Sequence, residues 1–146
     1  MSAVIEWMYP ESPVSKPDIE YVEKYFEVKL PDDLKSVILR HNGASPRPCT
    51  FNLGKSAEVF RQLFSFKEED ESFIIIVYKN VREYLPAWTF PIADDPTGNL
   101  ICIRYANKSD NKPIVVYWEH DSFENDPNKR ITKIANSFSE LLSCLH

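Results

Sequence analysis

Histidine and cysteine are the residue types of this chain best suited to acid–base or nucleophilic chemistry, and the sequence contains 3 of each. His120 lies in Glu119-His120-Asp121, where the alternation of strand side chains keeps the three groups apart unless the preceding strand has already ended. Cys102 lies inside an apolar run, where a free cysteine behaves as a small hydrophobic residue and lacks the electropositive setting of a nucleophile. A hydrolase using His120 or Cys102 is therefore the least favoured function, and we expect no catalytic residues.

The sequence also lacks the residue spacings that bind metals and phosphates. Its 3 glycines are isolated from one another, so no glycine-rich phosphate loop is present. The 3 cysteines are widely spaced without a Cys-x-x-Cys pair, which fits neither a zinc site nor a disulfide framework. Asp94, Asp95 and Asn99 share one turn but lack the spacing and the final glutamate of a calcium loop. We therefore expect no metal and no cofactor.

Acidic residues gather instead in three segments, at residues 68–71, at Asp94-Asp95 and at residues 119–126. They form either a solvated surface that aids solubility or a recognition surface for a cationic protein, where complementary charge accelerates encounter. One or two exposed aromatic residues beside the carboxylates would supply the anchor of an interface. The aromatic residues near these acids are Trp88, Tyr117, Trp118 and Phe123. The residues predicted to bind a partner are Glu69, Asp70, Asp94, Asp95, Asn99, Trp118, Glu119, Asp121 and Glu124.

Composition and charge argue against two classes of partner. Nucleic-acid binding needs clustered Lys and Arg, whereas here 17 basic residues stand against 22 acidic ones, a net charge of −5. The N-terminal residues lack the basic start and apolar core of a signal peptide, and the most apolar run, residues 73–78, is far shorter than the ~20 residues of a membrane-spanning helix. With the unpaired cysteines, these features predict a cytoplasmic protein that binds neither nucleic acid nor membranes.

Hydrophobic spacing organises the 146 residues into one domain, with residues 1–14 as an N-terminal arm. Helices are expected from Ser15 or Pro17 to Phe26, from Pro31 to His41, over residues 73–84 and from Ser137 onward. Strands are expected at residues 50–53, 59–66, 88–93, 100–105, 114–118 and 131–135. Residues 59–66 also fit a helical stripe, and the strand is favoured. This order predicts an α+β domain with a largely antiparallel sheet.

Five segments of the chain resemble, in order, the successive motifs of the SUKH superfamily. They are Leu30-Pro31-Asp32-Asp33-Leu34-Lys35, His41-Asn42-Gly43, Phe90-Pro91-Ile92-Ala93-Asp94-Asp95 with Gly98-Asn99-Leu100-Ile101-Cys102-Ile103, Val116-Tyr117-Trp118-Glu119-His120-Asp121, and Ile134-Ala135-Asn136-Ser137-Phe138. The resemblance extends from Ser15 to Leu145, nearly the whole chain. The chain departs from the pattern at Asn99 and in an inserted-looking Pro96-Thr97.

The resemblance implies a curved, largely antiparallel sheet with helices packed against it, and no catalytic residues. Bacterial members of the superfamily bind and neutralise secreted polymorphic toxins, often nucleases, in the cytoplasm of the producing cell. The resemblance thus implies an immunity protein that occludes a cognate toxin, and the −5 charge favours a basic nuclease domain as the partner. The alternative is a non-catalytic regulatory scaffold, like the yeast cell-wall-synthesis regulator of the same superfamily.

Overall fold

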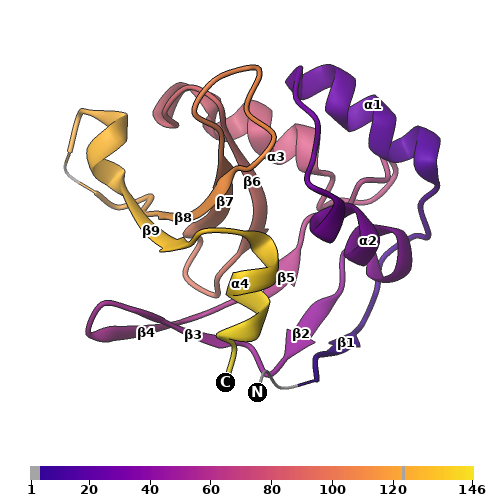
Figure 1. The fold of residues 1–146 in the computed structure, drawn as a ribbon, viewed down its shortest axis with the longest axis horizontal. Coiled ribbons are helices and arrows are strands. Elements are labelled where there is room, and N and C mark those ends of the chain that lie inside the picture. Colours follow the sequence, from indigo (N-terminus) through magenta and orange to yellow (C-terminus); the bar gives the residue numbers. More distant parts are fainter. Residues whose placement is uncertain (1–3, 123) are drawn as a thin grey trace.

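A five-stranded antiparallel sheet forms the centre of the molecule, as seen in a computed structural model that describes residues 4–122 and 124–146 (Figure 1). Its strands lie in the order β5 (Gln62–Leu63), β6 (Thr89–Asp94), β7 (Leu100–Arg104), β8 (Ile114–Trp118) and β9 (Ile131–Ala135). Nearly every residue of β6, β7 and β8 is buried. Because successive strand residues point to opposite faces, both faces of this part of the sheet are covered.

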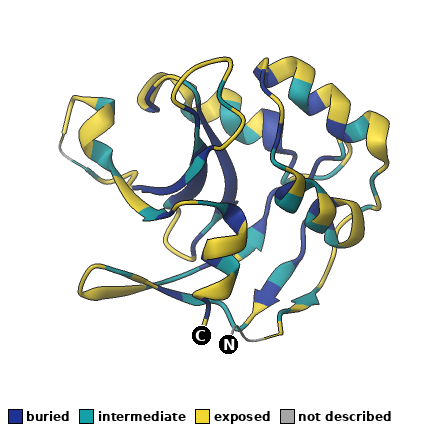
Figure 2. Ribbon diagram, viewed as in Figure 1, coloured by how far each residue is buried: buried dark blue, intermediate teal, exposed yellow. Residues whose placement is uncertain are grey.

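Helices and two small two-stranded sheets surround the central sheet. The helices are α1 (Lys16–Phe26), α2 (Asp32–His41), α3 (Ile74–Val81) and α4 (Phe138–Ser143), and two short 3-10 helices are η1 (Arg82–Tyr84) and η2 (Pro127–Arg130). One small antiparallel sheet pairs β1 (Glu6–Met8) with β2 (Ser45–Arg47), which follows α2 in the chain, and the other is a hairpin of β3 (Thr50–Leu53) and β4 (Ser56–Val59). In Figure 1, α1, α2 and α3 gather on one side, and the β3–β4 hairpin runs along the bottom beside α4. Figure 2 shows burial concentrated in the sheet and on the inward helix surfaces.

Helix α1 shows how local sequence determines the packing around the sheet. Its buried residues Ile19, Val22 and Phe26 recur every three or four positions, which places them on one helix face. Asp18 accepts a hydrogen bond from the backbone N–H of Ser15 at 2.9 Å, which stabilises the start of the helix. The Phe26 ring stacks on Phe90 of β6 with ring centroids 4.4 Å apart. Apolar spacing and this aromatic contact therefore hold α1 against the sheet.

The end of α2 depends on a glycine. Gly43 follows the helix with a φ of 72°, the left-handed conformation that a residue without Cβ adopts most readily. A Cβ at this position would lie 2.3 Å from Cγ of Glu11, closer than two carbon atoms can approach. The chain entering α1 thus crosses directly over the end of α2.

The predicted α+β class and antiparallel sheet are confirmed, and all four predicted helices are present. The predicted order of elements was wrong at its start, because β1 and β2 precede the first predicted strand. These three-residue strands carry no alternating apolar pattern, and Pro46 lies within β2. The predicted strand at residues 59–66 is also divided, since β4 ends at Val59 and β5 comprises only Gln62 and Leu63.

Candidate functional site

A buried aspartate organises the turn between β6 and β7. The side chain of Asp95 is only 3% exposed. Its Oδ1 accepts three hydrogen bonds of 2.9 Å, from the backbone N–H and the hydroxyl of Thr97 and from the backbone N–H of Asn99. Gly98, with a φ of 92°, allows the turn to close. One carboxylate oxygen therefore fixes the path of the turn.

The second oxygen of Asp95 connects this turn to strand β8. The Tyr117 hydroxyl donates a hydrogen bond to Asp95 Oδ2 and accepts one from the Asn99 side-chain amide at 2.8 Å. Glu58 Oε2 of β4 lies 3.3 Å from the same hydroxyl. Burial by itself would raise the pKa of Asp95, but the hydrogen bonds that its carboxylate accepts outweigh burial and lower the pKa. Burial and the bond to Asp95 raise the pKa of Tyr117, so at neutral pH an ionised carboxylate meets a neutral phenol.

Asn99 joins the same turn to the loop that follows β8. Its Oδ1 accepts a hydrogen bond of 3.0 Å from the backbone N–H of His120 and also lies 2.7 Å from Nδ1 of the His120 ring. Because the Asn99 amide nitrogen is directed at Tyr117, its oxygen faces the imidazole, and Nδ1 of His120 carries a proton. His120 Nε2 lies 3.3 Å from Asp121 Oδ1. Two of the three acidic segments are thereby held together at one end of the sheet.

Asp94, the other acid of this turn, already has a cationic partner within the chain. Both of its carboxylate oxygens accept hydrogen bonds from the Arg61 guanidinium, through Nε at 3.1 Å and through Nη2. Only 14% of the Asp94 side chain is exposed. Its charge is therefore largely matched internally.

A scan against family models assigns residues 13–144 to the SMI1 / KNR4 family (SUKH-1). The chain belongs to this family. The match covers all five resembling segments, so the resemblance read from the sequence is confirmed. A comparison with curated proteins gave no match. The family includes immunity proteins, which suggests that this SUKH-1 chain binds a partner protein.

The residues predicted to bind a partner differ greatly in their exposure. Glu69, Glu119, Asp121 and Glu124 are exposed, Asp70, Asp94 and Asn99 are partly buried, and Asp95 and Trp118 are buried. Trp118 is only 3% exposed, and its indole N–H donates to the backbone oxygen of Tyr84 at 3.3 Å. As η1 covers this end of β8, Trp118 belongs to the core of the SUKH-1 domain and offers no anchor to a partner. The predicted aromatic candidate Phe123 lies outside the described residues.

The third acidic segment, residues 68–71, lies elsewhere on the molecule. Its Asp70 accepts hydrogen bonds from the hydroxyls of Ser12 and Ser65 at 2.7 and 2.6 Å, which bind the N-terminal segment to the loop before α3. Lys67 forms an ion pair with Asp18 of α1 at 3.2 Å. In Figure 1 this loop lies beneath α1, whereas the β8–β9 connection, which includes η2, lies at the opposite edge of the view. The three acidic segments therefore do not form one continuous surface.

Cys102 and His120, the side chains best suited to nucleophilic or acid–base chemistry, lie in different environments. Cys102 is fully buried, and burial raises the pKa of its thiol, so a substrate in solvent cannot reach a thiolate there. His120 is exposed, and its two ring nitrogens contact the side chains of Asn99 and Asp121, which orient the ring. Among residues 4–122 and 124–146, no group of three or more His, Cys, Asp or Glu side chains is arranged to hold a metal ion. In the same part of the chain, no helix has the length and apolar character needed to cross a membrane.

A buried asparagine holds three segments of the domain together. Asn42 is 3% exposed, and its amide donates to the Ser12 carbonyl at 2.8 Å and to the Ser65 hydroxyl at 2.9 Å. Its Oδ1 accepts a hydrogen bond of 2.8 Å from the backbone N–H of Phe66. The sequence His41-Asn42-Gly43 predicts only the end of a helix, because these partners are 23 to 30 residues away in the chain.

Proposed function

We propose that this SUKH-1 chain is an immunity protein that binds and occludes a cognate secreted toxin in the cytoplasm, without catalysing a reaction. The proposed contact surface, called the acidic rim, consists of Glu58, Glu119, Asp121 and Glu124. The main structural support is the pair of contacts from Asn99 to His120, which fixes the start of the acidic β8–β9 loop on the central sheet. Family membership supports a protein partner, and the net charge of −5 supports a basic one, such as a nuclease domain.

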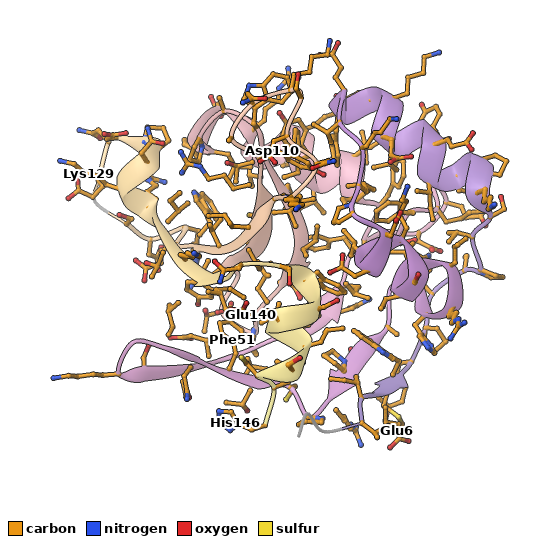
Figure 3. All side chains as sticks on the ribbon, viewed as in Figure 1. Glu6, Phe51, Asp110, Lys129, Glu140 and His146 are labelled. Carbon is orange, nitrogen blue, oxygen red and sulfur yellow. The ribbon has the colours of Figure 1, made fainter. Side chains whose placement is uncertain are left out.

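The charges near the acidic rim favour a cationic partner. Within the described residues, Glu119 and Glu124 form no ion pair. The nearby Arg130 is turned toward the domain, since its Nε donates to the Glu124 carbonyl at 2.8 Å and its guanidinium lies 5.7 Å from the centre of the Tyr84 ring. Lys129 is at the outer edge of the molecule on η2 (Figure 3). Lysine and arginine side chains that a nuclease uses to hold phosphates would meet the carboxylates of Glu119 and Glu124, which form no ion pair among the described residues.

Capture of the partner followed by co-expression tests the proposed function. The tagged full-length chain is used to capture proteins from the cell that produces it, and each captured candidate is expressed with and without the chain. Rescue of growth by direct, stoichiometric binding is the expected result. Survival no better than without the chain rules out immunity, and capture of a non-toxic partner instead favours the regulatory scaffold.

Charge reversal at the acidic rim is expected to weaken toxin binding by about 10- to 100-fold, because loss of complementary charge slows association. The variant combines Glu119→Lys, Asp121→Lys and Glu124→Lys, all at exposed positions. Association and dissociation rates are measured by surface plasmon resonance at low and high salt. Binding of the unmodified chain should weaken as salt rises, since exposed charges are screened beyond about 8 Å at physiological ionic strength.

A second triple variant provides a control with the same net charge. It combines Glu68→Lys, Glu69→Lys and Glu71→Lys, three exposed acids of the loop beneath α1. This variant is expected to retain most of the affinity, because the loop is remote from the rim. Loss of toxin binding in the control alone would show that the toxin contacts residues 68–71 and not the acidic rim. An equal loss in both variants would mean that the net charge of the chain, not the location of the charges, controls binding.

A further inference from the structure

An aromatic pocket lies where the end of α1, η1 and the start of β6 meet. Its volume is about 360 Å³, and the aromatic residues lining it are Tyr25, Phe26, Tyr78, Trp88 and Phe90. The Phe26 ring centroid lies 4.4 Å from that of Phe90 and 5.1 Å from that of Tyr78, so the aromatic side chains support one another. Tyr25 is 37% exposed and Trp88 is partly exposed. The pocket therefore combines a rigid aromatic floor with aromatic groups accessible from solvent.

The backbone at Trp88, which lines this pocket, is strained. Trp88 has a φ of 58°, in the left-handed region that residues with a Cβ rarely occupy. Glu27 also lines the pocket, and its φ of 59° is that of a left-handed helix C-cap at the end of α1. The Trp88 carbonyl accepts a hydrogen bond of 2.9 Å from the Tyr105 backbone N–H, which holds this conformation. Such conformations persist where surrounding structure enforces them, and they are concentrated at binding and catalytic sites.

Positive charges at the edge of the pocket are not balanced by acidic side chains nearby. Arg82 lines the pocket and is exposed, and among the described residues its guanidinium has no carboxylate within ion-pair distance. Lys79 lies 5.6 Å from the centre of the Tyr25 ring, adding a second positive charge at the edge. Glu27 is the one acidic residue lining the pocket. The net charge at the edge of the pocket is therefore positive, opposite in sign to that of the acidic rim.

We propose that this pocket binds a segment of a protein partner that inserts one apolar side chain and presents a carboxylate beside it to Arg82. Tyr, Trp and Arg are the residues most enriched at the energetic centres of protein interfaces, and all three line this pocket. The aromatic floor receives the apolar group, and the guanidinium can bind the carboxylate through two parallel hydrogen bonds. A pocket of this volume accommodates a side chain of the size of leucine or phenylalanine.

Titration of the full-length chain with short peptides tests the proposal. The probe is a hexapeptide with blocked termini in which Phe-Leu is flanked by Glu and Asp. One comparison peptide replaces both acids with Lys, and another replaces Phe-Leu with Ala-Ala. Binding is followed by two-dimensional NMR, and the acidic Phe-Leu peptide should cause saturable shifts of the Trp88 indole N–H and the Arg82 amide, with at least tenfold weaker binding of both comparison peptides.

Arg82→Glu is expected to weaken binding of the acidic Phe-Leu peptide at least tenfold. Arg40→Glu makes the same charge change at an exposed position of α2 and should leave binding unchanged. Three outcomes overturn the proposal: no saturable shift up to millimolar peptide, equal binding of the lysine peptide, or an equal effect of Arg40→Glu. Because the acidic rim is not part of this pocket, failure of this test does not affect the toxin-binding proposal.

Discussion

Replacement of Asp95 by alanine is expected to lower the free energy of unfolding by about 2–4 kcal/mol, since a hydrogen bond to a charged group contributes about 1.5–3 kcal/mol and buried partners are left unsatisfied. The substitution removes the acceptor for Thr97, Asn99 and the buried Tyr117 hydroxyl together. Urea denaturation followed by circular dichroism measures the loss. Asp121→Ala is the matched control, because 90% of the Asp121 side chain is exposed, and it should change stability by less than about 0.5 kcal/mol.

The contribution of Asp95 should also depend on pH in a defined direction. Its pKa in the folded protein is lowered from the ordinary value of 3.8, so the folded state binds the proton less readily than the unfolded state. The stabilisation is therefore fully present above the unfolded-state pKa and is lost as the pH falls through the lowered pKa of the folded protein. The stability difference between the unmodified chain and Asp95→Asn should narrow as the pH falls below about 4. A difference that stays constant from pH 7 to acid would contradict this assignment.

Asp95 connects stability to the proposed binding surface. It positions Asn99, and Asn99 in turn positions His120 between Glu119 and Asp121. An acidic loop whose start at His120 is already held in place loses less conformational freedom when a partner binds, and such preorganisation strengthens binding. Asp95→Ala should therefore increase the mobility of the β8–β9 loop even under conditions in which the domain remains folded.

Local patterns in the sequence were sufficient to predict the elements around the site. The spacing of Ile19, Val22 and Phe26 predicts α1, and the β-branched and aromatic run at residues 114–118 predicts β8. Pro96 and Gly98 predict the turn that Asp95 organises. Each of these features depends on residues within a few positions of one another, and for that reason they can be read directly from the chain.

The arrangement of the site could not be predicted in the same way. Trp118 follows a buried strand and precedes acids, a pattern that is equally compatible with an exposed anchor and with a core residue. Only the packing of η1 over β8 decides between them. Asp95 is buried because Tyr117, 22 residues away, supplies a partner. Likewise, the separation of residues 68–71 from the other acidic segments follows from tertiary contacts, of Asp70 with Ser12 and of the neighbouring Lys67 with Asp18.

Replacement of Asn42 by alanine is expected to destabilise the domain by about 2–4 kcal/mol, since three hydrogen bonds are lost and buried partners remain unsatisfied. The Phe66 N–H and the Ser12 carbonyl would both lose their partner at the buried junction of the N-terminal segment, the end of α2 and the loop before α3. Urea denaturation gives the global loss, and amide hydrogen exchange should accelerate most strongly at Phe66, whose N–H bonds to the Asn42 side chain. Asn80→Ala, at an exposed position of α3, is the control and should change stability by less than about 0.5 kcal/mol.

The variant Asn42→Asp distinguishes the contribution of hydrogen-bond donation by Asn42 from the contribution of its side-chain size. An aspartate of nearly the same shape still accepts from the Phe66 N–H but can no longer donate to Ser12 and Ser65. It also places a second carboxylate near Asp70, which shares the Ser65 hydroxyl with Asn42. Because buried, unpaired charge is costly, this variant should be at least as unstable as Asn42→Ala at neutral pH and should regain stability when acid protonates the new carboxyl group. Full stability of Asn42→Asp at neutral pH would show that donation by Asn42 does not hold the three segments together.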